Sequence, residues 1–91
     1  MKIVTNACFG GFSVSDFVVE KLGLEDEYDD VSRTDPRLIA LIEEFGSEAC
    51  SGDCAELVID EIPDSATDWE IDEYDGAESI IYVVDGKIRH R

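Results

Sequence analysis

The segment Asp68-Trp-Glu-Ile-Asp-Glu-Tyr-Asp-Gly-Ala-Glu-Ser-Ile-Ile-Tyr-Val-Val-Asp-Gly-Lys87 decides the architecture of this chain. Its first residues place Trp69 and Ile71 on one side and acidic residues on the other, a period of two that predicts a strand with one solvated face. One Asp-Gly dipeptide follows this strand and another follows the apolar residues 79–84, and Asp-Gly is a strong signal for a hairpin turn. Because residues 79–84 are apolar on both faces, we expect them inside the sheet or beneath a helix.

Upstream of this segment, the sequence predicts two helices and two further strands. Residues 2–9 and 55–60 have strand character, and Gly10-Gly11 ends the first of these strands. One helix is expected to start near Ser13–Asp16 and to stop at Gly23, and a second runs from Asp35 and Pro36 to Gly46. The second helix carries apolar residues at i, i+3, i+4 and i+7. We therefore expect a single domain over residues 1–91 with an α+β fold, in which a small antiparallel sheet of three to five strands has two helices packed on one face.

The charge of the chain is its most unusual property. It has 23 acidic and 7 basic residues, for a net charge of −16 in 91 residues. From Leu38 to Gly86 there are fifteen Asp and Glu residues and no Lys or Arg. A surface of this kind repels the nucleic-acid backbone and anionic membranes, so neither is an expected direct partner. A basic protein surface is the expected partner, and a homodimer remains an alternative arrangement.

The cysteine and histidine content argues against a metal centre or a catalytic site. The chain has an odd number of cysteines, namely Cys8, Cys50 and Cys54. Met1 leads directly into a strand-like segment, so no signal peptide is expected. We therefore expect reduced thiols in the cytoplasm. A mononuclear zinc site would need all three cysteines and His90, the only histidine, to converge. No nucleophile–base pair or EF-hand spacing is present. We therefore expect no cofactor, no metal and no enzymatic activity.

The acidic residues of two predicted strands form the first candidate site. Side chains two residues apart on a strand lie about 6.5–7 Å apart, which resembles the spacing of successive phosphates in a nucleic-acid backbone. If the strand at 55–60 lies beside the strand at 68–74, two rows of carboxylates result. The structural alternative is an ordinary solvated sheet face, although such a face normally mixes charge signs. The expected partner-binding residues are Glu56, Asp60, Asp68, Glu70, Asp72, Glu73 and Asp75.

The glycine turn after the first strand forms an alternative site. Free N–H groups between a strand and a helix start can hold an anion, and hydroxyls and an arginine can add to them. This set comprises Gly10, Gly11, Phe12, Ser13, Ser15 and Arg33. The pattern lacks the signatures of a P-loop or a dinucleotide fingerprint. Its structural alternative is a tight turn with Phe9 and Phe12 in the core, and Arg33 is expected to form an internal ion pair with Asp30 or Asp35.

Four segments of the chain resemble a family of short phage and prophage proteins. They are Met1-Lys-Ile-Val-Thr-Asn-Ala-Cys-Phe-Gly-Gly-Phe-Ser13, Ser32-Arg-Thr-Asp-Pro-Arg-Leu-Ile39, Ala55-Glu-Leu-Val-Ile-Asp-Glu-Ile-Pro-Asp64 and Trp69-Glu-Ile-Asp-Glu-Tyr-Asp-Gly-Ala-Glu78. That family has no assigned activity, and its members tend to end in a basic-aromatic stretch where this chain has a Val-Val-Asp-Gly-Lys ending. The resemblance implies a phage-encoded protein that acts in the cytoplasm of a bacterial host.

Charge and resemblance together lead to three functional expectations. The first is a counter-defence inhibitor whose acidic surface mimics nucleic acid and blocks a basic nucleic-acid-binding host protein. The second is a sponge that sequesters a small or cyclic nucleotide signal in the glycine turn. The third is a structural or assembly module without a ligand. All three are binding or structural roles, and none requires catalysis.

Overall fold

The computed structural model describes residues 1–29 and 31–91, which form three helices and five strands. The strands are β1 (Lys2–Asn6), β2 (Leu57–Glu61), β3 (Asp68–Tyr74), β4 (Ala77–Val84) and β5 (Lys87–His90). The helices are α1 (Asp16–Leu22), α2 (Pro36–Phe45) and α3 (Ser47–Cys50). This content confirms the α+β class. It also adds α3, which the sequence pattern did not predict.

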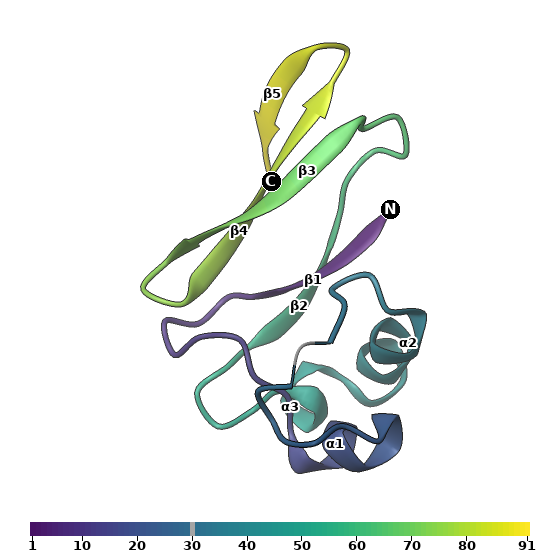
Figure 1. Ribbon diagram of the computed structural model, residues 1–91, viewed down its shortest axis with the longest axis vertical. Coiled ribbons are helices and arrows are strands. Elements are labelled where there is room, and N and C mark those ends of the chain that lie inside the picture. Colours follow the sequence, from purple (N-terminus) through teal and green to yellow (C-terminus); the bar gives the residue numbers. More distant parts are fainter. Residues whose placement is uncertain (30) are drawn as a thin grey trace.

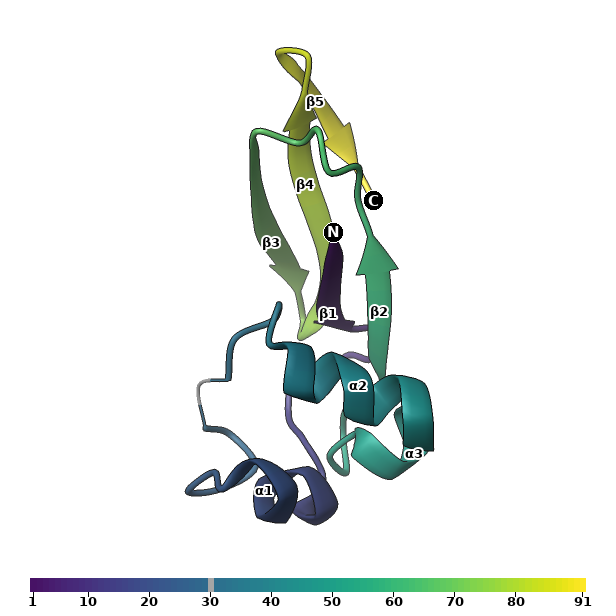
Figure 2. The same ribbon diagram turned by 90° about the vertical axis from the view of Figure 1, so that its right-hand side faces the viewer.

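The strands form two antiparallel sheets that meet along one seam (Figure 1). β1 pairs with β2, whereas β3, β4 and β5 form a meander in that order. β4 lies beside β1, so that β4 and β1 stand between β3 and β2 (Figure 2). The expectation that residues 79–84 lie inside a sheet is therefore confirmed. The molecule is elongated, with extents of 40 × 26 × 21 Å.

Local chemistry explains where the helices begin and end. Ser15 caps α1, and Gly23 ends it in the left-handed conformation at φ 68°. Asp35 caps α2 and accepts a hydrogen bond from the Arg37 N–H. Pro36 occupies the first turn of α2, where its missing N–H costs nothing. Both helices lie where their capping residues predicted them.

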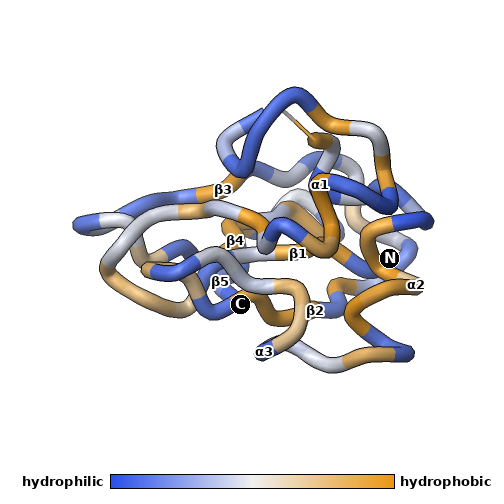
Figure 3. The backbone as a smooth tube through the Cα atoms, turned by 90° about the horizontal axis from the view of Figure 1, so that it is seen from below, coloured by the Kyte–Doolittle hydropathy of each residue, from blue (hydrophilic) through white to orange (hydrophobic). Residues whose placement is uncertain are grey.

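The three helices cover the β1–β2 sheet and leave the meander bare. α2 packs on β1 and β2, α3 packs on β2, and α1 packs on the other two helices. Figure 3 shows hydrophobic stretches (orange) along α1 and α2, interrupted by hydrophilic ones (blue). The main core contains the apolar side chains Val4, Val14, Val18, Val31, Leu38, Ile42, Cys50 and Leu57. The meander extends beyond this core, as Figure 1 shows.

A second, smaller core joins the meander to β1. Ile3, Ile62 and Ile80 are buried there, and Trp69 and Tyr82 pack against them. Trp69 and Tyr82 are cross-strand partners on β3 and β4, so they point to the same side as Ile80. This side of the meander is its inner face. The opposite side, which we call the outer face, contacts no helix of the described residues.

Candidate protein-binding surface

The outer face of the meander carries a row of carboxylates beside a row of aliphatic side chains. The register pairs Asp68 with Val83, Glu70 with Ile81 and Asp72 with Ser79, and Val83 in turn with Ile88 of β5. Because cross-strand partners share a face, all of these side chains lie on one side. The outer face therefore consists of Asp68, Glu70, Asp72, Tyr74, Ala77, Ser79, Ile81, Val83, Ile88 and His90.

The carboxylates of this face have no cationic partner within the described residues. Four ion pairs occur there, and they join the Met1 amine to Asp64, Lys2 to Glu43, Arg33 to Glu78 and Arg37 to Asp35. Asp68, Glu70 and Asp72 are exposed and take part in none of them. Three of the seven basic side chains are thus engaged with carboxylates that lie off the outer face. The negative charge of β3 remains available to a partner.

A groove of about 170 Å³ is formed by residues of β3, β4 and β5. It is lined by Asp68, Trp69, Glu70, Ile81, Val83 and Ile88. Ile88 is 69% exposed and adds apolar area to this surface. The surface therefore combines charge with apolar area, as protein-binding surfaces do.

The structure places the other expected acidic residues elsewhere. The condition for two rows of carboxylates is not met, because β2, which contains Asp60 and directly follows Glu56, pairs with β1 in a different sheet from β3. Asp60 is only partly exposed and accepts a hydrogen bond of 2.8 Å from the Thr5 hydroxyl. Glu73 points to the side opposite Glu70 on β3, and Asp75 sits in the β3–β4 turn. Three of the seven residues, Asp68, Glu70 and Asp72, thus form one continuous row.

The glycine turn packs against other backbone and does not form an open cradle. A Cβ built at Gly10 would collide with Cys54, and one built at Gly76 would collide with the backbone of Phe9 and Gly11. Glycine is needed at both positions because the loop that contains Gly10 and Gly11 lies directly against Cys54 on one side and against the β3–β4 turn on the other. Phe9 is 68% exposed, so the expectation that it lies in the core is wrong. The chain has already left β1 at Ala7, and the strand alternation therefore no longer applies to Phe9.

The two serines of this segment have structural roles. The Ser15 hydroxyl donates a hydrogen bond of 2.7 Å to the Ala49 carbonyl and accepts one from the Val18 N–H. Ser13 is buried, and its side chain lies directly against Gly52. Ser15 thus connects the start of α1 to α3, and Ser13 contacts the segment that follows α3. Neither hydroxyl points freely into solvent for a ligand.

The Arg33 side chain contacts three groups, the first of which is the Val4 carbonyl, to which it donates a hydrogen bond of 3.3 Å. Its guanidinium pairs with the two carboxylate oxygens of Glu78, at 2.5 and 2.9 Å, and its centre lies 3.6 Å from the middle of the Phe12 ring. The expectation of an internal ion pair is confirmed, but the partner differs. Asp35 pairs with Arg37 instead, and Asp30 lies outside the described residues.

Asn6 and Glu78, which the sequence did not single out, connect the two sheets. The Asn6 side chain donates to the carbonyls of Cys8 and Gly76 and accepts from the N–H groups of Cys8 and Glu56. Glu78 accepts from the Asn6 N–H at 2.9 Å and from Arg33. An asparagine side chain makes at most four such bonds, so Asn6 is fully satisfied. No sequence signal links Asn6 to Gly76, because 70 residues separate them.

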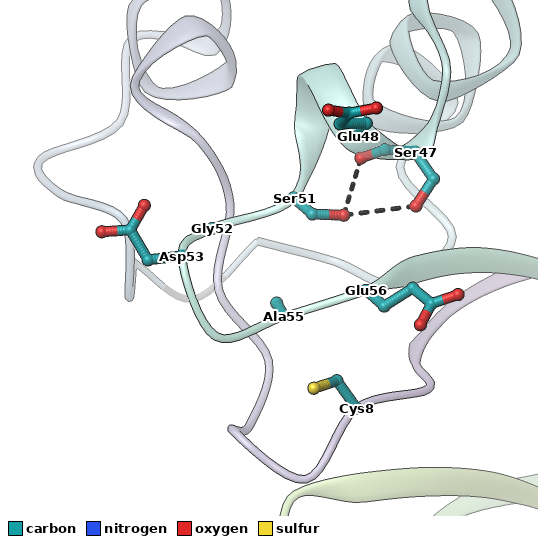
Figure 4. Close-up of a pocket in the computed structure, with 8 residues that line it drawn as sticks. All are labelled: Cys8, Ser47, Glu48, Ser51, Gly52, Asp53, Ala55 and Glu56. Carbon is teal, nitrogen blue, oxygen red and sulfur yellow. Dashed lines mark hydrogen bonds between the residues drawn. The ribbon is translucent and has the colours of Figure 1, made fainter.

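A larger cleft of about 580 Å³ lies between α3, the 52–56 segment and Cys8 (Figure 4). Its carboxylates come from Glu48, Asp53 and Glu56, and Figure 4 shows them at different sides of the cleft and not converging. In residues 1–29 and 31–91, no group of three or more His, Cys, Asp or Glu side chains is arranged to hold a metal ion. The cleft therefore presents no assembled chemical centre.

Several ionisable groups are shifted by their surroundings. Burial raises the pKa of the Cys50 thiol, which makes it a poor nucleophile. The hydrogen bond and ion pair with Arg37 lower the pKa of Asp35, and the terminal amine lowers that of Asp64. A hydrogen bond to Glu43 raises the pKa of Lys2. These shifts follow from single structural contacts outside the outer face.

No family model, curated protein or solved structure matches this chain. None of the helices in the described part of the chain is long and apolar enough to span a membrane. The outer face thus remains the candidate site on physical grounds alone.

Proposed function

We propose that this protein acts by binding, and that the outer face of its meander docks on a basic surface of a partner protein. The observation that carries the proposal is the uncompensated row of Asp68, Glu70 and Asp72 on a bare strand. A row of this kind attracts a basic partner and speeds the encounter through electrostatic steering. The action needs no catalysis and no cofactor.

The spacing of the row favours a partner that ordinarily holds nucleic acid. Alternate side chains on a strand repeat at about 6.5–7 Å, close to the repeat of phosphates along a nucleic-acid backbone. Lysines and arginines arranged to receive phosphates would meet carboxylates at a similar repeat. Together with the resemblance to short phage proteins, this supports a phage-encoded inhibitor of a host defence protein that works in the bacterial cytoplasm.

The apolar part of the outer face favours a protein partner over a simple counterion. Ile81 and Val83 lie directly beside Glu70 and Asp68, and Ile88 lies beside Val83 on the next strand; all three line the groove. Burying aliphatic area of this kind contributes about 25 cal/mol per Å². Charge steers the partner to the face, and the apolar groove slows its release.

The alternative of a nucleotide sponge finds less support in the geometry. Arg33, its only nearby cation, is paired with Glu78, and Ser15 is engaged in the cap of α1. A ligand phosphate would have to break the Arg33–Glu78 pair to reach the guanidinium. The outer face needs no such rearrangement.

Capture from host lysate tests this proposal. The wild-type protein and a variant with Asp68→Lys and Glu70→Lys are immobilised, and nuclease-treated lysate is passed over each at low salt. We expect the wild type to retain a basic nucleic-acid-binding protein that moderate salt releases, and the variant to lose it. A variant with Glu20→Lys and Glu44→Lys, two exposed residues on α1 and α2 that take part in none of the ion pairs given above, changes the net charge equally and serves as the control. Retention of the same protein by all three would contradict the proposal.

A further inference from the structure

β3 is an edge strand whose outward main-chain groups can be assigned from the turn that follows it. Tyr74 and Ala77 flank the two-residue Asp75-Gly76 turn and are cross-strand partners. In a hairpin of this type the flanking pair is hydrogen-bonded, and bonded and non-bonded pairs alternate along the ladder. Glu70 and Asp72 therefore bond to β4, whereas Trp69, Ile71 and Glu73 direct their N–H and C=O groups away from it.

The other hairpin confirms this alternation. The Arg91 N–H donates to the Ile80 carbonyl at 2.8 Å, so Ile80, Tyr82 and Val84 bond toward β5. The residues between them, such as Ile81 and Val83, must then form their main-chain hydrogen bonds with β3. On the outward side of β3, the Trp69 N–H bonds to the Asp68 carboxylate. No other hydrogen bond of the described residues engages the outward groups of Ile71 and Glu73.

An open edge of seven residues is a template for another strand, and natural proteins normally protect such edges. Here the protection is electrostatic, because two copies of β3 side by side would place acidic rows together. Pairing β3 with β5 of another copy in a continuous sheet would put Ile88 and His90, and not Lys87 or Arg89, beside the carboxylates. Such a head-to-tail contact also fails to close into a dimer. Charge thus disfavours pairing of β3 with a second β3 and favours pairing with a basic strand.

We propose that the free edge of β3 accepts an extended basic segment of the partner protein as a fourth strand of the meander. Main-chain hydrogen bonds to Ile71 and Glu73 would provide affinity, as in other cases of strand addition. This inference rests on the proposed function, because it names the way in which the basic partner binds the same face.

The side chains of β3 define the pattern of the incoming segment. Its residues on the outer face lie beside Asp68, Glu70 and Asp72, so lysine or arginine is favoured there. Its residues on the inner face lie beside Trp69 and Ile71, which are only partly buried, so apolar residues are favoured there. The edge selects a segment in which basic and apolar residues alternate.

A synthetic peptide that alternates Lys and Val over seven residues is the probe. Trp69 is the only tryptophan in the chain, and its indole lies on the inner side of β3, where it would meet the Val side chains of a peptide paired with this edge, so its fluorescence reports binding. Two further peptides carry N-methyl groups, either on every Val or on every Lys. N-methylation removes the N–H of a residue, and only one of the two sets of N–H groups faces β3. We expect one N-methylated peptide to bind at least about tenfold more weakly and the other to bind like the parent.

A matched pair of variants tests the protein side of the contact. Glu73→Pro removes an outward N–H without affecting the β4 ladder, and proline is tolerated at such edge positions. Glu73→Gln removes the same charge and keeps the N–H. We expect the proline variant to bind the parent peptide about tenfold more weakly than the glutamine variant. We also expect the amides of Ile71 and Glu73 to become protected from hydrogen exchange when the peptide binds.

Three outcomes would separate the two proposals. If both N-methylated peptides bind equally and Glu73→Pro matches Glu73→Gln, the contact is electrostatic, and the strand-addition proposal is overturned while the proposed function stands. If the Asp68→Lys and Glu70→Lys variant retains the lysate partner, the proposed function itself fails. Self-association of the free protein through β3, seen as amide protection that grows with protein concentration, would assign the edge to a second copy and overturn the inference.

Discussion

Asn6, Arg33 and Glu78 show how a small acidic protein uses a few buried polar residues to join two sheets. The Glu78 side chain is 4% exposed, and its carboxylate accepts hydrogen bonds from Arg33 and from the Asn6 N–H. A buried carboxylate is tolerated only when it is paired and hydrogen-bonded. The three residues therefore act as one unit that holds β4 against β1.

Removal of Arg33 is the sharpest test of this unit. Arg33→Ala leaves the Glu78 carboxylate buried without a cation, and we expect a loss of about 3 kcal/mol in the free energy of unfolding. Arg37→Ala removes an exposed arginine that also pairs with a carboxylate, and it should cost less than about 1 kcal/mol. Urea unfolding of both variants measures the difference. Equal effects would show that Glu78 is not held by Arg33 in solution.

Asp35 gives the protein a pH-dependent contribution at the start of α2. Its contacts with Arg37 lower its pKa in the folded state below the ordinary value of 3.8. A depressed pKa contributes stability that is present above the unfolded value and is lost as pH falls through the folded one. Asp35→Asn keeps an N-cap acceptor but loses this charge. We expect the variant to be less stable at pH 6 and the gap to shrink toward pH 2.5, as followed by thermal unfolding at each pH. A gap that stays constant would contradict the assignment.

Which carboxylate pairs with Arg33 could not be predicted from the sequence. The sequence indicates an internal pair, because a lone arginine in an acidic segment has many carboxylates to choose from. Its actual partner lies 45 residues away, and only the packing of β4 on β1 selects it. By contrast, Asp35 caps its own helix. Its partner Arg37 is only two residues away, and a contact between residues so close in the chain can be predicted from the sequence.

At the scale of elements, local signals located most helices and strands, and long-range pairing decided how the strands combine. Pro36 and Gly46 mark the ends of α2, and the Asp-Gly dipeptides mark both turns of the meander. α3 was not predicted, because its four residues are too few for a helical period to show. The division into two sheets also has no local signal, since the alternation in β2 is the same whichever strand lies beside it.

The two turns of the meander provide a matched prediction. Gly76 and Gly86 both adopt positive φ, at 90° and 73°, so an alanine at either pays a conformational penalty of about 1–2 kcal/mol. A Cβ at Gly86 meets nothing within 4 Å, whereas one at Gly76 collides with the backbone at Phe9 and Gly11. We expect Gly76→Ala to destabilise the protein clearly more than Gly86→Ala, measured by chemical unfolding. Similar losses would mean that the β3–β4 turn does not pack on the glycine loop.

At the scale of the whole molecule, the net charge of −16 must oppose folding. Four ion pairs within the described residues neutralise only a small part of the acidic charge. Two like charges about 10 Å apart in water repel by about 0.4 kcal/mol, and many such pairs exist on a molecule of this size. The acidic excess therefore carries a stability cost, and binding a basic partner would relieve it.

Salt should consequently stabilise this protein. Raising the ionic strength from about 0.01 M to about 0.1 M shortens the screening length from about 30 Å to about 10 Å. Repulsion between distant carboxylates then falls, whereas the buried Arg33–Glu78 pair is screened much less. We expect the free energy of unfolding to rise by about 1 kcal/mol over this range, an estimate that follows from the pairwise repulsion above. Urea unfolding in NaCl and in KCl, at equal ionic strength, measures it.

A neutralised outer face provides the control for this effect. A variant with Asp68→Asn, Glu70→Gln and Asp72→Asn keeps the size of each side chain and removes three adjacent charges. We expect it to be more stable than the wild type at low salt and to respond less to added salt, because part of the repulsion is already gone. Stability that falls with salt, or an unchanged slope in the variant, would show that the acidic row is not a source of repulsion.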